Sequence, residues 1–226
     1  TPDDRTPSSA ACQRGRTLER GREIGHHRPK SVCEGRGKVS LRHMSRIMII
    51  RHAEKHNGGR ERGVNLEGIH TKHELTVRGW LRAGALVRFF APVGGTPPGF
   101  PISTPRSIFA AAATPDSPSL RSQHTVLPLA AVLGLHVDKG YAEGEEAEIA
   151  AAALAAPGPV LISWHHSHSP LLARAIAGEP FECPGGWPDD RFDVVWVLDR
   201  DDAAGGAWTF SQFAQRLFAY DRDEPI

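Results

Sequence analysis

Short apolar runs alternate with longer segments of helical spacing along most of the chain. Residues 47–50 form a short apolar run that predicts a strand at 46–50, and from Thr76 to about Phe90 the apolar positions repeat at the spacing of one helix face. Thr76 is typical of the residue that caps a helix at its N-terminus. The alternation continues toward the C-terminus and predicts strands at about 107–111, 135–138, 160–163, 194–198 and 208–213, with helices at about 117–134, at 145–156 and from Pro170 onward.

This order of elements predicts the class of fold. Strands that alternate with helices of 10–15 residues are typical of an α/β protein, and we expect a three-layer α/β/α sandwich with a mostly parallel sheet. The last strand alternates in polarity, so we expect it at an edge and antiparallel. The segments 55–74, 92–101 and 178–191 lack periodicity and are expected to be loops that determine specificity.

The first 43 residues differ from the rest. They have almost no apolar periodicity and are rich in Gly, Pro, Ser and Arg, so we expect a disordered basic arm, 1–43, followed by one folded domain, 44–226. Met44 or Met48 would be a natural start for the folded part, in which case the arm is an artefact of the start site. A solvated tail is the simpler interpretation of the arm, and a nucleic-acid-binding segment is the alternative.

Charge and composition narrow the possible partners. Residues 1–43 contain ten Lys or Arg against five Asp or Glu, whereas the remainder contains 17 against 21. A slightly acidic body argues against nucleic acid as a partner. The chain has no apolar run long enough to cross a membrane and no short apolar segment typical of a secretory signal, so we expect a cytoplasmic protein without a membrane partner. The three cysteines, Cys12, Cys33 and Cys183, are too few and too scattered for a disulfide framework or a zinc site.

Candidate chemistry begins where apolar strands end. The strand at 46–50 is followed directly by Arg51 and His52, and the strand at 160–163 is followed after one residue by His165. Ligands bind at the carboxyl ends of parallel strands. An imidazole there can act as a nucleophile, and a guanidinium can hold phosphate through two hydrogen bonds. Arg121, expected near a helix N-terminus, adds a further donor to an anion pocket.

Two further groups of residues are candidates. Asp138 follows another short strand, and a carboxylic acid there could protonate a leaving alkoxide. Glu143 lies close behind it and is more simply explained as an acid near a helix N-terminus. A zinc hydrolase that uses the histidines of 165–168 is an alternative, but no acidic or cysteine partner stands at a recognised ligand spacing.

Several of these segments occur together, in a familiar order, in one superfamily. The segments are Arg51-His52-Ala53-Glu54, Leu75-Thr76 with Gly79, Arg121 with Thr125, the strand and histidine at 160–165, and the closing strand at 210–217. Taken together they resemble the histidine phosphatase superfamily, the phosphoglycerate-mutase-like proteins, in its first branch. The resemblance spans roughly residues 46–220.

The resemblance implies roles for the candidate residues. His52 would take the phosphoryl group on its imidazole, and Arg51, Arg121 and His165 would hold the phosphoryl oxygens. No metal or other cofactor is implied, because two guanidiniums and a histidine can neutralise a phosphate. The substrate would be a small phosphate ester or a phosphoprotein. Asp138 lies near the position where many members have their acidic glutamate, and Glu143 with Gly144 matches a following Glu-Gly, so the general acid is Asp138 or Glu143.

The sequence also departs from the family pattern. Ala53 replaces the usual glycine, and His166 stands where glycine often follows the second histidine. The Arg-x-Tyr-Gly segment of the glycolytic mutases is missing, which favours a phosphatase over a mutase. The competing interpretation is a catalytically inactive module that binds a phosphorylated ligand on the same fold. Nothing in the sequence indicates an oligomeric state.

Overall fold

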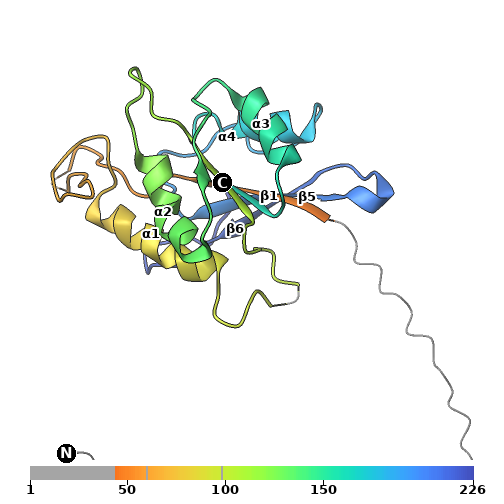
Figure 1. The fold of residues 1–226 in the computed structure, drawn as a ribbon, viewed down its shortest axis with the longest axis horizontal. Coiled ribbons are helices and arrows are strands. Elements are labelled where there is room, and N and C mark those ends of the chain that lie inside the picture. The colour runs from red at the N-terminus through yellow and green to blue at the C-terminus, as the bar shows by residue number, and fades with distance from the viewer. Residues whose placement is uncertain (1–43, 60, 98) are drawn as a thin grey trace, which may run out of the picture. The chain divides into compact units, whose positions relative to one another are not determined.

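The computed structural model describes residues 44–59, 61–97 and 99–226, and the predicted arm at 1–43 lies outside them (Figure 1). The predicted three-layer α/β sandwich is confirmed: helices cover both faces of a six-stranded sheet. The strands are β1 (Met44–Arg51), β2 (Ser107–Ala110), β3 (Val137–Asp138), β4 (Val160–Trp164), β5 (Val194–Asp201) and β6 (Thr209–Ala214). The helices are α1 (Val77–Phe90), α2 (Arg121–Leu133), α3 (Glu146–Ala155) and α4 (Ser169–Ala177), with a short 3-10 turn at Asp202–Ala204.

The sheet is mostly parallel, in the order β3-β2-β4-β1-β5-β6. The pairs β3–β2, β2–β4 and β4–β1 are parallel, whereas β1–β5 and β5–β6 are antiparallel. The last strand, β6, lies at an edge as predicted and pairs antiparallel with its neighbour. The strand that runs against the other five is, however, β5. The tight connection around Gly205, whose φ is 58°, joins β5 to β6 as a hairpin, which requires antiparallel pairing.

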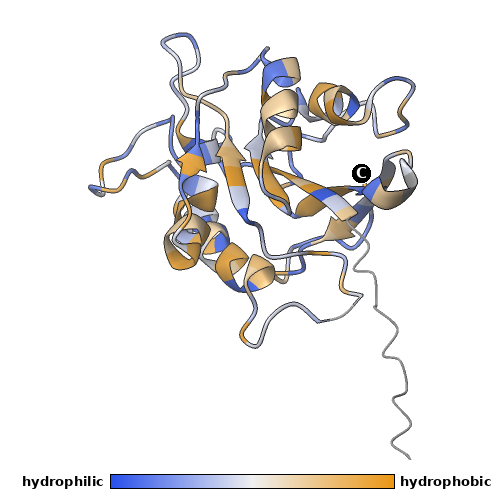
Figure 2. Cartoon of the chain, turned by 45° about the vertical axis from the view of Figure 1, so that its right-hand side comes forward, coloured by the Kyte–Doolittle hydropathy of each residue, from blue (hydrophilic) through white to orange (hydrophobic). Residues whose placement is uncertain are grey.

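The alternation of side chains along each strand separates two apolar cores. Ile47 and Ile49 of β1 point to the face covered by α3 and α4, and Met48 and Ile50 point to the face covered by α1 and α2. All four are almost completely buried. Figure 2 shows apolar residues concentrated on the strands and on the helix surfaces packed against them. A strand that is buried on both faces reads as a continuous apolar run, and this explains the sequence of 46–50.

The helix boundaries agree with the prediction, with one correction. α1 begins after Thr76 and ends at Phe90, and α2 ends before Gly134, whose φ of 65° stops the helix. We expected α2 to start at Ser117 or Ser119, but it starts at Arg121. The reason is a local turn in which the Ser117 amide donates to Oγ1 of Thr114, so this serine closes a turn and does not cap the helix.

None of the helices among the described residues is both long enough and apolar enough to cross a membrane.

Candidate functional site

Arg51, His52 and His165 lie at the carboxyl ends of β1 and β4, whereas the predicted acid Asp138 lies farther along the sheet. Arg51 is the last residue of β1 and pairs with Trp164, the last residue of β4, so His52 and His165 follow on neighbouring parallel strands. Arg121 is the first residue of α2. Its charge contributes to lowering the pKa of both histidines.

His52 has its ring buried and its tautomer fixed. The side chain is only 4% exposed, and Nδ1 lies 2.7 Å from the carbonyl oxygen of Ala53. A carbonyl only accepts hydrogen bonds, so Nδ1 holds the proton and Nε2 has the free lone pair. Burial, followed by the charges of Arg51 and Arg121, lowers the pKa of His52 well below its usual value. The imidazole is therefore neutral at pH 7, as a nucleophile must be.

Arg51 is anchored by one half of its guanidinium. Nη1 donates to the backbone oxygens of Pro188 (2.9 Å), Asp189 (2.8 Å) and Arg191 (3.3 Å). The guanidinium also lies 4.2 Å from the ring centre of Phe192. The other half, Nε and Nη2, is buried and makes no hydrogen bond in the structure. Burial lowers the pKa of Arg51 to about 10, so the group stays charged at neutral pH.

Among the described residues, the guanidinium of Arg121 is likewise hydrogen-bonded through one nitrogen only. Its Nη1 donates to the carbonyl of Lys72 at 3.0 Å, while Nε is buried without a hydrogen bond. Thr125 fixes the start of the helix next to the segment that contains His52: its hydroxyl donates to the carbonyl of Arg121 and accepts from the amide of Ala53, both at 2.8 Å. This explains the spacing of Arg121 and Thr125 in the motif. The sequence had given Thr125 no role.

Three guanidinium nitrogens beside one neutral imidazole thus make no hydrogen bond to any described residue, although Nη2 of Arg51 lies 3.6 Å from the carboxylate of Asp189. They are Nε and Nη2 of Arg51 and Nε of Arg121. A buried donor without a partner costs about 1–3 kcal/mol, and more when it is charged, so proteins rarely keep several together without a ligand. Fork-shaped charged donors match an anion with several oxygens, such as phosphate. The arrangement is therefore suited to binding a phosphoryl group next to Nε2 of His52.

His165 lies beside a carboxylate. Its Nδ1 is 3.8 Å from Oε2 of Glu143, whose other oxygen is 3.0 Å from His168. Burial lowers the pKa of His165, and the charge of Glu143 opposes that shift in part. His168 also contacts Glu146 at 2.9 Å, which connects α3 to the loop that contains His165. Glu143 thus lies within reach of the site, although the sequence interpreted it first as a helix-terminal acid.

Asp138 lies farther along the sheet. It is the last residue of β3, which β2 separates from β4, and its carboxylate accepts from the amide of Gly140 at 3.0 Å. Within the described part of the chain, no contact joins Asp138 to His52, Arg121 or His165. Its assignment as the general acid remains a prediction.

The zinc alternative finds no support in the geometry. Across residues 44–59, 61–97 and 99–226, no three His, Cys, Asp or Glu side chains form a group that could hold a metal ion. The neighbouring histidines have different partners: His165 faces Glu143, whereas His166 faces Asp189 at 2.9 Å.

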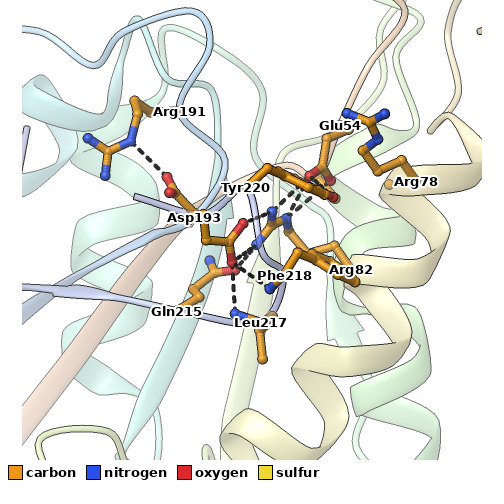
Figure 3. A network of polar contacts seen from close by, with 12 residues as sticks. Glu54, Arg78, Arg82, Arg191, Asp193, Gln215, Leu217, Phe218 and Tyr220 are labelled. Atoms are coloured by element: carbon orange, nitrogen blue, oxygen red, sulfur yellow. Dashed lines mark hydrogen bonds and ion pairs between the residues drawn. The ribbon is translucent and has the colours of Figure 1, made fainter. Parts of the chain in front are cut away.

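A buried polar network fixes the segment that follows His52 (Figure 3). Arg82 of α1 is 1% exposed and donates to Glu54 at 2.8 Å and to Asp221 at 2.6 Å. Gln215 accepts from the same guanidinium, and the Tyr220 hydroxyl donates to Glu54. The network joins α1, the end of β6 and the C-terminal segment to the residue two positions after the nucleophile, so it limits how far His52 can move.

The chain was compared with known proteins. It matches no protein-family model and no curated protein. Among solved structures it is similar to a mycobacterial glucosyl-3-phosphoglycerate phosphatase, with 17% identity over 74% of this chain and 97% of that chain and a TM-score of 0.42. An Escherichia coli protein described as an alpha-ribazole-5'-P phosphatase is 15% identical over 76% of this chain and 97% of that chain, with a TM-score of 0.41. A protein described as mycobacterial hydrolase 1 gives 13% identity over 74% and 97%, with a TM-score of 0.44.

Proposed function

We propose that the chain is a metal-independent phosphatase that hydrolyses phosphomonoesters through a phosphohistidine intermediate on His52. The observation that supports this most directly is that guanidinium nitrogens of Arg51 and Arg121 make no hydrogen bond to a described residue and lie beside a neutral imidazole. Phosphoryl transfer depends mainly on positioning and on neutralising charge, and these residues supply both.

The reaction proceeds in two steps. The phosphoryl oxygens bind the free nitrogens of Arg51 and Arg121, with His165 as a further donor, and Nε2 of His52 attacks phosphorus. An N–P bond forms as the ester P–O bond breaks, and the leaving alkoxide takes a proton from a carboxylic acid. Water then attacks phosphorus, the N–P bond breaks, and the same carboxylate accepts a proton from the water. Phosphate leaves and neutral His52 is restored.

We assign the general acid to Glu143, with Asp138 as the alternative. Glu143 is favoured because its carboxylate lies 3.8 Å from His165, whereas the described contacts of Asp138 are local to its own turn. A proton donor must reach the leaving oxygen, so closeness to the phosphoryl-binding residues comes before any other criterion.

The test is hydrolysis of a generic aryl phosphate at pH 5–8 with a chelator present, comparing the native protein with His52→Ala. The matched control is His136→Ala, which removes an exposed histidine. Loss of the nucleophile should lower kcat by at least about a thousandfold, and the control should keep native activity. Labelled phosphate trapped on the native protein should be acid-labile and base-stable, as an N–P bond is.

Two results would contradict the proposal. Chelator-resistant turnover that survives in His52→Ala would exclude His52 as the nucleophile. No turnover of any ester, with inorganic phosphate still raising the melting temperature, would favour the inactive ligand-binding module on the same fold.

A further inference from the structure

A carboxylate lies on the rim of the proposed phosphoryl site. Oδ1 of Asp189 is 2.9 Å from Nε2 of His166 and 3.6 Å from both Nη2 of Arg51 and Nζ of Lys55. The side chain of Asp189 is 80% exposed. Its environment is therefore set mainly by its neighbours Arg51, Lys55 and His166, which we call the cationic rim. Its charge also acts on Arg51, where it opposes the effect of burial on the pKa.

The backbone holds this carboxylate in place. Nη1 of Arg51 donates to the carbonyls of Pro188, Asp189 and Arg191, so the loop is fixed by the same guanidinium whose Nε and Nη2 make no hydrogen bond to a described residue. Trp187 is buried, and its Nε1 donates to the carbonyl of Arg191 at 2.9 Å. The loop therefore cannot move away from the site without disturbing Arg51.

Asp189 also borders a cavity of about 600 Å³ next to the cationic rim. Lys55 and Asp189 belong both to that rim and to the cavity wall. The wall contains six Asp or Glu side chains against five Lys or Arg. Its cations are committed to acids: Arg82 binds Glu54 and Asp221, Arg191 binds Asp193, and Arg222 binds Asp190. Lys55 lies 3.6 Å from Asp189 and Arg78 lies 4.0 Å from Glu61, so every Lys or Arg among the described lining residues contacts an acid and none is left unpaired for a second anionic group.

We propose that Asp189 is a specificity-determining residue that selects phosphate esters whose alcohol part is uncharged or cationic. This inference rests on the proposed phosphatase function. An ester bound at Arg51 and His52 directs its alcohol part past Asp189 into the cavity. A carboxylate or second phosphate on the first carbons of that part then approaches Asp189, and like charges a few ångströms apart weaken binding. An ammonium or hydroxyl group meets no such repulsion.

The test measures binding of phosphonates, whose C–P bond this chemistry does not hydrolyse. The probes are methylphosphonate, 2-aminoethylphosphonate and phosphonoacetate, and their Kd values are measured by calorimetry on the native protein, on Asp189→Asn and on Asp190→Asn. Asp190 is the matched control because it is the adjacent, exposed acid, lies in the same cavity wall and is paired with Arg222.

For the native protein we expect phosphonoacetate to bind most weakly and 2-aminoethylphosphonate at least as tightly as methylphosphonate. In Asp189→Asn, the preference for 2-aminoethylphosphonate over phosphonoacetate should fall by about tenfold. Asp190→Asn should keep the native ratio. Because the ratio compares probes on one protein, it cancels any general change in affinity for the phosphonate group.

Each other outcome overturns the inference. An unchanged ratio in Asp189→Asn, with binding intact, would remove Asp189 as a selectivity residue and leave the phosphatase proposal standing. If Asp190→Asn changed this ratio of affinities equally, the effect would come from the total negative charge of the cavity wall and not from Asp189. Weaker binding of all three probes in Asp189→Asn would show that the carboxylate only positions Arg51 and Lys55. If none of the proteins binds any phosphonate or inorganic phosphate, the site at Arg51 and His52 does not bind phosphoryl groups. Both the proposed function and this inference would then be wrong.

Discussion

Burial and two guanidiniums act on the His52 ring in the same direction. Both disfavour the imidazolium, while the Ala53 carbonyl fixes the proton on Nδ1. In the proposed reaction, the arginines that neutralise the incoming phosphoryl group are therefore the same ones that keep Nε2 of His52 unprotonated. This double effect requires Arg51 and Arg121 to lie close to His52, and it explains why the site is buried and not placed on an open surface.

The general acid can be identified by a pair of isosteric substitutions. Glu143→Gln should lower kcat for a poor leaving group, such as an alkyl phosphate, by about 10²–10³-fold. Asp138→Asn should change it little. Activity on an activated aryl phosphate should fall much less in either variant, because a good leaving group needs no proton. A large loss with Asp138→Asn and none with Glu143→Gln would restore Asp138 as the acid.

Individual residues differ in how far the sequence could predict them. Arg51, His52 and His165 were recognisable because each follows a strand directly, where the chain itself determines the position. Asp189 was not recognisable, because it reaches the rim through a loop more than 130 residues away whose backbone is held by Arg51. Glu143 was interpreted as a helix-terminal acid because its contact with His165 depends on how α3 packs.

At the scale of elements, α1 is positioned by its first turn. Thr76 accepts from the amide of Gly79 as the helix cap, and its own amide donates to the carbonyl of Glu54. A Cβ on Gly79 would lie 2.5 Å from that carbonyl oxygen. The Leu-Thr-x-x-Gly spacing is therefore a docking motif: it places the start of α1 directly against the segment that follows His52.

Two glycine substitutions in α1 should have opposite effects on stability. Gly79→Ala should destabilise the protein by about 1–3 kcal/mol, because the new methyl group meets backbone that cannot move away cheaply. Gly84→Ala, the matched control, should stabilise it by up to about 1 kcal/mol, because its Cβ meets nothing within 4 Å and alanine favours a helix. Urea unfolding measures both. Equal effects of the two variants would contradict the docking role.

The elements that the sequence predicted best are those buried on one or both faces. The apolar run within 46–50 predicted a strand, because a strand buried on both faces is continuously apolar. The apolar positions of α1 predicted a helix, because burial of one helix face gives a helical periodicity. The direction of β5 was not predictable, because an apolar run reads the same in parallel and antiparallel pairing, and only the hairpin to β6 determines it. The start of α2 was misplaced because a serine in a turn resembles a serine that caps a helix.

At the scale of the whole molecule, the site makes stability depend on pH. The pKa values of His52, His165 and His166 are all lowered in the folded protein, in each case chiefly by burial, that of His166 to about 4. In the unfolded chain such groups titrate near pH 6.5. Below that pH the unfolded state binds more protons than the folded state, so the free energy of unfolding decreases as the pH falls.

The expected slope is steep enough to measure. Below pH 6.5, a histidine that stays neutral in the folded state lowers the free energy of unfolding by at most about 1.4 kcal/mol per pH unit, and the more exposed His166 should contribute less than His52. Urea unfolding at pH 7, 6 and 5.5 stays above the range in which carboxylates titrate, so the histidines dominate the change. His52→Asn should flatten the slope, whereas His136→Asn, at an exposed position, should leave it unchanged. A free energy of unfolding that is constant from pH 7 to 5.5 would show that these rings are not held neutral. The electrostatic basis of the proposed nucleophile would then be wrong as well, because its readiness to attack and this loss of stability have the same physical cause.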